Sequence, residues 1–249
     1  MIDIHTHVLP GIDDGAADLD EALAMCRLAA DGGCEAVIAT PHQRTPAWEN
    51  TDPATLEALR RLVADETGGR PAVHPGGEIR IDSTLLDELE RHPDSGLQPL
   101  AGSRYLLLEF SRREPLVDPA ALTHELIVGG WRPVYAHPEL ISFLAADLGL
   151  IERLAELGAM FQVTAMSVTG DAGPRAQAVS ERMLERGLVH FVASDAHGRD
   201  RRPPDLHRAR RHIAERWGED LAERLTDGNP RRVLADVPLA TPVAAPAGG

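Results

Sequence analysis

Two histidines near the start of the chain have a spacing that suits shared metal binding. His5 and His7 lie two residues apart in an apolar stretch, and alternate side chains of a β-strand leave the same face, so both imidazoles can reach one ion. A His-x-His pair by itself is explained equally well by two surface histidines. Here the apolar surroundings favour a buried strand, and the run Asp13-Asp14-Gly15 follows closely enough to add an oxygen ligand.

The same spacing returns near the other end of the chain, and further polar residues follow other apolar runs. Asp195 and His197 come soon after the apolar segment 191–193. His42, Glu109 and His137 likewise stand at the ends of apolar runs. In barrel folds the carboxyl ends of the strands meet at one face, where several of them aim side chains at a single cavity. We therefore expect these five residues to converge.

Glu78 adds another carboxylate, and the complete donor set limits the choice of metal. Glu78 follows a Pro75-Gly-Gly turn, and taken alone it is more simply explained as an exposed charge beside Arg80. The accumulated donors favour ligation instead. Mixed imidazole and carboxylate donors without cysteine suit Mn, Fe or Zn, and the large share of carboxylates favours Mn.

The remaining histidines lack both the strand-end placement and the paired spacing. We interpret them as structural or surface groups; they are His74, His92, His124, His190, His207 and His212. The tryptophans Trp48, Trp131 and Trp217 are interpreted as packing residues.

Strands and helices must alternate along the chain to position these donors. Predicted strands cover residues 2–8, 36–40, 72–75, 105–110, 133–137, 160–163 and 190–194, and predicted helices cover 18–31, 53–65, 83–91, 119–129, 148–157 and 175–186. Such alternation is typical of βα units that enclose a parallel sheet. We predict a distorted (β/α) barrel, with an open doubly wound sheet as the alternative.

Length, charge and cysteine spacing define the general class of the protein. The 249 residues suit one barrel-sized domain, which we place at residues 1–240, with a flexible tail at 241–249. The net charge of −14 disfavours nucleic-acid binding. No apolar run approaches the length needed for membrane insertion. The lack of a signal segment and of disulfide-like spacing between Cys26 and Cys34 predicts a cytoplasmic protein.

Six motifs in chain order give the sequence a family resemblance. They are residues 1–15 (MIDIHTHVLPGIDDG), 40–42 (TPH), 77–80 (GEIR), 108–110 (LEF), 136–139 (AHPE) and 191–197 (FVASDAH). Together they resemble the bacterial capsule-type PHP tyrosine-protein phosphatases. The resemblance implies a distorted (β/α)7 barrel of the PHP type that holds up to three metal ions, often manganese. The metal ligands it implies are His5, His7, Asp14, His42, Glu78, Glu109, His137, Asp195 and His197.

The chain departs from these phosphatases at one substrate contact. They usually carry an arginine directly after His-Pro-Glu, where this chain has Leu140. Arg202, seven residues beyond Asp195, matches another family arginine that contacts the substrate phosphate, and it is our candidate catalytic residue. Arg112 and Arg113 could replace the missing arginine in space, but we interpret them as a solvated basic loop after Glu109.

The resemblance implies a specific reaction, and the residues leave others open. Metal ions can activate water and clamp phosphoryl oxygens, and neither cysteine lies in a glycine-rich loop that ends in arginine, so we expect no cysteinyl-phosphate intermediate. The implied substrate is phosphotyrosine on a cognate tyrosine kinase of capsule or exopolysaccharide biosynthesis. The alternatives are a small phosphate ester of the histidinol-phosphate type, a non-phosphate bond, or metal-stabilised kinase binding without turnover.

Overall fold

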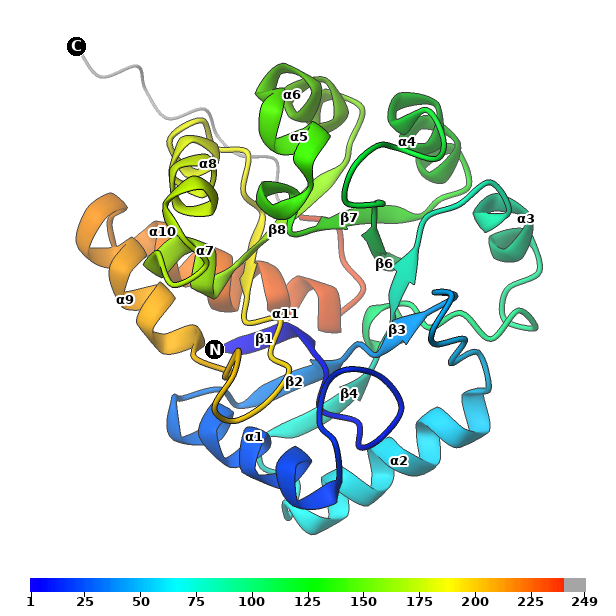
Figure 1. Ribbon diagram of the computed structural model, residues 1–249, viewed down its shortest axis with the longest axis vertical. Helices are drawn as coiled ribbons and strands as arrows, with labels where there is room; N and C mark the ends of the chain where they lie inside the picture. The colour runs from blue at the N-terminus through cyan, green and yellow to red at the C-terminus, as the bar shows by residue number, and fades with distance from the viewer. Residues whose placement is uncertain (240–249) are drawn as a thin grey trace.

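The described part of this computed structural model, residues 1–239, contains nine parallel β-strands in two sheets (Figure 1). One sheet has the order β1-β2-β4, and the other has the order β3-β5-β6-β7-β8-β9. The strands are β1 (Ile2–Thr6), β2 (Ala36–Ala39), β3 (His42–Gln43), β4 (Ala72–Pro75), β5 (Glu78–Arg80), β6 (Tyr105–Glu109), β7 (Arg132–Ala136), β8 (Met160–Thr164) and β9 (Phe191–Ala193).

The two sheets follow one another around a distorted barrel. Only two residues separate β2 from β3, and two separate β4 from β5, so each pair occupies one position that bends from the first sheet into the second. Beyond β9 the chain returns to β1, where a single parallel bridge joins Thr6 to Ala196. The nine strands of the described residues therefore fill seven positions in chain order. This order fits the predicted (β/α)7 barrel and lacks the reversal of a doubly wound sheet.

Most of the helices surround the strands on the outside, as the ring in Figure 1 shows, whereas the last helix, α11, lies in the middle of that view. The α-helices are α1 (Leu19–Asp31), α2 (Pro53–Glu66), α3 (Leu85–Glu90), α4 (Pro119–Val128), α5 (Ser142–Ala146), α6 (Leu148–Glu156), α7 (Ala165–Thr169), α8 (Pro174–Glu185), α9 (Leu206–Trp217), α10 (Glu219–Glu223) and α11 (Asn229–Leu234). Short 3-10 turns occupy η1 (Leu100–Gly102) and η2 (Pro138–Leu140), and a π-helical turn occupies η3 (Arg224–Gly228).

The long helices begin at capping residues and bury one face. Asp18 precedes α1, and its side chain accepts a hydrogen bond from the Glu21 amide at 2.9 Å, which satisfies one of the amide groups left free at a helix start. In α1 the buried residues Ala22, Met25 and Ala29 recur every three or four positions, so a single stripe packs against the sheet. Asp52 and Asp118 cap α2 and α4 in the same way, each before a proline.

Apolar residues form two clusters, one outside and one inside the barrel. The larger one lies between the strands and the helices and includes Leu106 and Leu108 of β6. The smaller one includes Tyr105 and Leu107 of the same strand. Because side chains alternate along a strand, Glu109 shares the face of Tyr105 and Leu107. The inner apolar cluster thus lies below a polar layer at the carboxyl ends of the strands.

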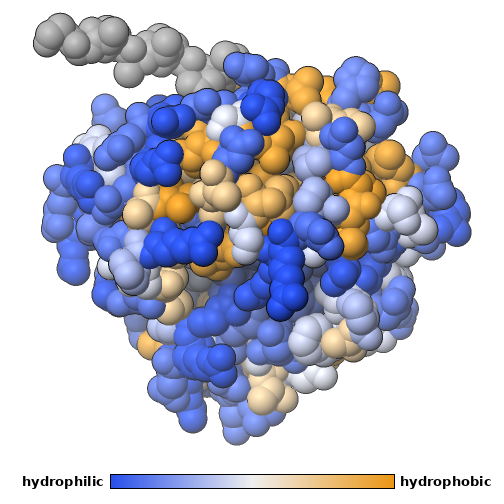
Figure 2. All heavy atoms as spheres, turned by 45° about the horizontal axis from the view of Figure 1, so that its top comes forward, coloured by the Kyte–Doolittle hydropathy of each residue, from blue (hydrophilic) through white to orange (hydrophobic). Residues whose placement is uncertain are grey.

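Figure 2 brings α4, α5 and α6 forward and shows apolar residues gathered among polar ones on that face. The exposed apolar side chains of these elements include Ile127 and Val128 at the end of α4 and Leu157 directly after α6. None of the helices in residues 1–239 is long and apolar enough to cross a membrane.

The predicted strands and helices agree with the structure to within about two residues at each end. The sequence did not predict β3, β5, α5, α7 or the C-terminal helices α9, α10 and α11. The predicted tail at 241–249 lies outside the described residues.

Candidate metal centre

The predicted donors lie where the strands end. His5 is on β1, and Glu109 is the last residue of β6. His42 of β3 and Glu78 of β5 are paired partners in neighbouring strands. Asp14 and His197 are in the loops that follow β1 and β9. The shared location follows from the parallel arrangement, because every strand contributes its carboxyl end to the same face.

Two of the donors stand in left-handed backbone conformations. His137, directly after β7, has a φ of 35°, and Asp195, soon after β9, has a φ of 53°. Residues other than glycine rarely adopt this conformation, and it is concentrated at functional sites. The turn it produces ends each strand abruptly at its donor.

Glu78 is at the centre of the cluster, with only 1% of its surface exposed. Its Oε1 lies 2.8 Å from His137 Nε2, and its Oε2 lies 2.9 Å from His42 Nδ1. The same Oε2 is 3.5 Å from Nε2 of both His5 and His7. The simpler sequence interpretation of Glu78, an exposed charge beside Arg80, is therefore wrong.

Asp195 and Asp14 each lie close to two imidazoles. Asp195 Oδ1 lies 3.2 Å from His5 Nε2 and 3.5 Å from His7 Nε2, and these two nitrogens are themselves 3.2 Å apart. Asp14 Oδ1 lies 3.3 Å from Nε2 of both His42 and His197. Carboxylate oxygens and imidazole nitrogens thus point into common spaces.

All nine predicted donors belong to this one cluster. Within each of four overlapping sets, one donor atom per residue lies within 4.8 Å of the others. The sets are His7, Asp14, His42 and His197; His5, His137 and Asp195; His5, His7 and Glu78; and His42, Glu78 and Glu109.

The cluster also contains buried polar atoms that need a partner. Glu78 Oε2 and His42 Nδ1 are both buried, and neither makes a hydrogen bond with another described residue. Their separation of 2.9 Å is that of an ion pair without hydrogen-bond geometry. Unpaired buried polar atoms are costly, and a bound cation would satisfy both. The donor set therefore fits a metal centre.

The carboxylates change the proton affinity of the histidines. Burial opposes a positive charge on His42, but the nearby carboxylates of Asp14 and Glu78 outweigh it and raise the pKa of His42 to about 10. Against the same effect of burial, Glu78 raises the pKa of His137 to about 9. Burial by itself would raise the pKa of Glu78, but the surrounding imidazoles, including the hydrogen bond from His137, outweigh it and hold that pKa well below its usual range. The protonated His42 and His137 thus supply positive charge to the carboxylates, which bound metal ions would otherwise supply.

Residues behind the cluster fix the orientation of its first two histidines. The His7 ring donates from Nδ1 to Asp13 Oδ2 at 2.7 Å, and the His5 ring donates from Nδ1 to Gln162 Oε1 at 2.9 Å. Both Nε2 atoms are thereby left free to face the cluster. Asp13 is held in turn by the amides of Gly15 and His42, at 2.9 and 3.0 Å. The sequence suggested an oxygen ligand from this run and did not single out Gln162.

Two more buried carboxylates support the loops after the strands. Asp3 Oδ1 accepts the Ser194 amide at 3.0 Å, and burial raises the pKa of Asp3 to about 6. Glu139 Oε1 accepts both the amide and the hydroxyl of Thr164, each at 2.9 Å. These bonds tie β1 to the segment after β9, and the turn after β7 to the end of β8. The motif 136–139 contained Glu139, but its role could not be read from spacing.

Trp48 packs directly on a donor. Its ring stacks on the His42 imidazole with centroids 5.5 Å apart and planes 11° apart. The prediction of a packing residue is consistent with this contact, and the surface it packs against is part of the cluster.

Arg202 lies at the edge of the cluster. Its guanidinium pairs with Asp195 Oδ2, and its side chain is 30% exposed. Arg202, Asp195 and Leu140 line one cavity of about 250 Å³, together with Arg112, Thr164, Met166, Ala172 and Ser194. The predicted phosphate-contacting arginine and the predicted missing contact are therefore neighbours in the same cavity.

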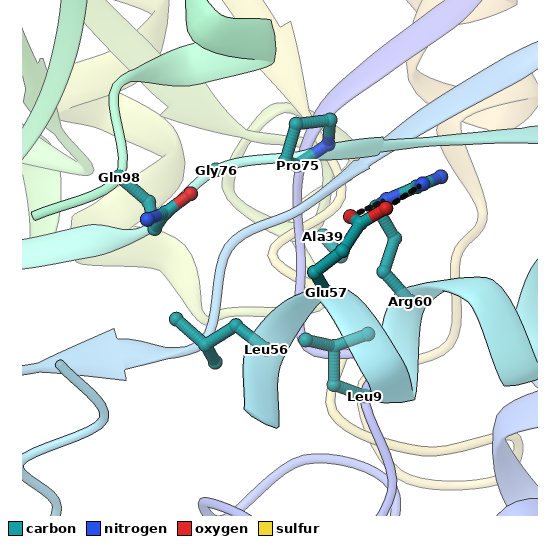
Figure 3. Close-up of a pocket in the computed structure, with 8 residues that line it drawn as sticks. All are labelled: Leu9, Ala39, Leu56, Glu57, Arg60, Pro75, Gly76 and Gln98. Atoms are coloured by element: carbon teal, nitrogen blue, oxygen red, sulfur yellow. Dashed lines mark hydrogen bonds and ion pairs between the residues drawn. The ribbon is translucent and has the colours of Figure 1, made fainter. Parts of the chain in front are cut away.

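A second cavity, shown in Figure 3, has no room for a substrate. It lies between α2 and the strands β2 and β4, where Glu57 and Arg60 form an ion pair at 2.7 Å. Its volume of about 20 Å³ is enough for roughly one water molecule. The cavity beside the donor cluster is the better candidate for substrate binding.

The chain is thus a parallel α/β barrel with a cluster of imidazole and carboxylate donors at its carboxyl face that fits a metal centre. Residues 1–235 match the family described as capsular polysaccharide synthesis, CpsB/CapC. The chain belongs to this family.

Named relatives share nearly the whole length of the chain. The tyrosine-protein phosphatase YwqE of Bacillus subtilis is 35% identical over 91% of this chain and 89% of its own. The tyrosine-protein phosphatase CpsB of Streptococcus pneumoniae is 30% identical over 95% of this chain and 99% of its own. A crystal structure from work on these two proteins, described as metal-dependent tyrosine phosphatases, superimposes with a TM-score of 0.90 at 32% identity, covering 96% of each chain.

More distant barrels share the fold alone. The β-aspartyl dipeptidase of Fervidobacterium islandicum superimposes with a TM-score of 0.59 at 16% identity, covering 94% of this chain and 72% of its own.

Proposed function

We propose that this protein is a metal-dependent phosphatase that hydrolyses phosphotyrosine on a protein substrate. The observation that carries the proposal is the convergence of nine imidazole and carboxylate donors at one buried strand-end cluster. The relatives named as tyrosine-protein phosphatases support the choice of substrate.

The donor cluster would hold the metals. We assign as ligands the residues that its overlapping sets contain: His5, His7, Asp14, His42, Glu78, Glu109, His137, Asp195 and His197. The overlap of the sets supports more than one ion, and the family resemblance implies up to three. The carboxylates among the donors favour Mn over Fe or Zn. When bound, such metals supply activation of water and neutralisation of charge on the phosphoryl oxygens.

The remaining work falls to side chains of the chain itself. Arg202 would donate charge-assisted hydrogen bonds to the phosphate, since its guanidinium lines the cavity beside Asp195. Asp13 and Gln162 keep the Nε2 atoms of His7 and His5 directed at the cluster. These contacts would orient the substrate and the ligands before reaction.

A cysteine nucleophile does not fit the structure. Cys26 and Cys34 are buried, and burial raises the pKa of each thiol to about 12. A thiol with such a pKa supplies almost no thiolate near neutral pH. Both cysteines are free, which suits a reducing compartment, and we propose that the protein acts in the cytoplasm.

The proposed protein partner is a tyrosine kinase of capsule or exopolysaccharide synthesis. This choice is supported by the description of the family, capsular polysaccharide synthesis.

A substrate panel tests the function. Protein loaded with Mn is assayed for release of phosphate from a phosphotyrosine peptide, a phosphoserine peptide and histidinol phosphate, and for hydrolysis of a carboxylic ester. We expect the phosphotyrosine peptide to give the highest kcat/KM. His7→Ala should abolish this activity, whereas His124→Ala, at an exposed position of α4, should retain it. A preference for histidinol phosphate or the carboxylic ester would refute the proposal.

A further inference from the structure

Arg112 is held in place beside the candidate metal centre by the loop that follows β6. Its carbonyl oxygen accepts the Ser142 amide at 2.9 Å, at the start of α5. Two residues earlier, the buried Phe110 packs edge-on against Phe143 with ring centroids 5.5 Å apart. The backbone of Arg112 is thus fixed between the segments that follow β6 and β7.

The side chain of Arg112 lines the same cavity as Arg202, Leu140 and Asp195. Unlike Arg202, whose guanidinium pairs with Asp195, Arg112 forms no ion pair with any residue in the range 1–239. Its five donors are therefore available to a ligand. The sequence interpretation of a solvated loop agrees with the exposure of Arg112. Its position in the cavity also makes it available to bind a ligand.

The cavity has one polar and one apolar set of lining residues. Asp195, Ser194 and the two arginines are polar, whereas Leu140 and Met166 are apolar. A phosphoryl group needs hydrogen-bond donors and positive charge, and an aromatic ring needs apolar surface. Its volume of about 250 Å³ lies just below the range of roughly 300–1,000 Å³ typical of sites that enclose a whole small ligand. It suits one side chain of a larger substrate.

We propose that Arg112 is a second phosphate-binding residue, which together with Arg202 holds the phosphoryl group of an aryl phosphate while Leu140 and Met166 contact the ring. The identity of the substrate rests on the proposed function, and the phosphate contact of Arg112 is tested independently of it.

The experiment measures binding of inorganic phosphate to Mn-loaded protein by calorimetry, and kcat/KM for a phosphotyrosine peptide, at equal metal content. The variants are Arg112→Ala and Arg112→Lys. The matched control is Arg113→Ala, which removes an adjacent exposed arginine that does not line the cavity. Since a hydrogen bond to a charged group contributes roughly a factor of 10 to 100 in affinity, Arg112→Ala should weaken phosphate binding by about that factor. Lysine should restore part of it because it keeps the charge without the planar fork.

The outcomes separate the two proposals. Phosphate affinity in Arg112→Ala within about twofold of the wild type, or equal losses in Arg112→Ala and Arg113→Ala, would overturn the role of Arg112. Absence of phosphate binding by the wild type would overturn it as well. If the wild type binds phosphate through Arg112 and does not hydrolyse the phosphotyrosine peptide, the proposed function fails and the phosphate contact stands.

Discussion

Replacing Asp13 by asparagine should weaken metal binding without removing a ligand. Asp13 is not one of the nine proposed donors, but its Oδ2 accepts the Nδ1 proton of His7 at 2.7 Å. Asparagine has the same shape and can keep one acceptor oxygen, while the negative charge disappears. The His7 ring then loses the charge-assisted bond that makes its Nε2 a better electron donor.

The size of the effect follows from the position of Asp13. Its side chain is only 1% exposed, so water cannot replace the lost carboxylate. Its oxygens also accept the Gly15 and His42 amides, and the amide group of asparagine cannot accept all three bonds. Loss of such a supporting carboxylate typically lowers metal affinity by about 10- to 100-fold, or about 1.4–2.7 kcal/mol.

Competition with a fluorescent chelator measures the Mn affinity of the wild type and of Asp13→Asn. The control is Asp18→Asn, which removes the same charge from the exposed N-cap of α1, where asparagine caps as well as aspartate. Equal Mn affinity in wild type and Asp13→Asn, or equal losses in the two variants, would refute the reasoning about His7.

Three further predictions concern pH, the cysteines and Leu140. In the folded metal-free protein the pKa of His42 is about 10 and that of His137 is about 9, both above the ordinary value of 6.5. The contribution of these two protonated histidines to folding stability is therefore complete below pH 6.5 and is lost as the pH rises through 9–10. The Tm of chelator-treated protein should therefore fall over that interval in thermal denaturation, and a constant Tm would contradict this coupling. Replacing either cysteine by serine should leave kcat unchanged in phosphopeptide turnover, and a large loss in a folded, metal-loaded variant would restore a thiol mechanism. Leu140→Arg should raise kcat/KM for the phosphopeptide, because a guanidinium beside the cavity adds donors that leucine lacks; no gain at equal metal content would count against this placement.

The convergence of the proposed donors could be predicted from the sequence because local chemistry determines where strands end. Apolar runs such as residues 36–40 stop at a proline or a polar residue, and the parallel fold then brings their ends together. The short strands β3 and β5, of two and three residues, escaped prediction because they are too short for any alternation to show. They continue β2 and β4 past Pro41 and the Gly76-Gly77 turn, which is a consequence of barrel distortion rather than of local sequence.

Other features had a weak signal or none. Helix α9 buries Leu206, Ala209 and Ile213 at helical spacing, so its pattern was present but diluted by arginines. The support of His5 by Gln162 joins residues 157 positions apart, and only the folded barrel reveals it. The same is true of the cavity shared by Arg112 and Arg202, since nothing in the chain relates the loops that carry them.

The most direct test of the proposed metal centre is the dependence of phosphotyrosine peptide hydrolysis on bound metal. Metal-free protein is titrated with Mn, and phosphate release and Mn per chain are measured on the same samples. The proposed cluster predicts no turnover without metal, a rise with occupancy, and full activity only above one ion per chain. Turnover that persists in metal-free protein, or protein that binds no Mn while remaining active, would contradict it.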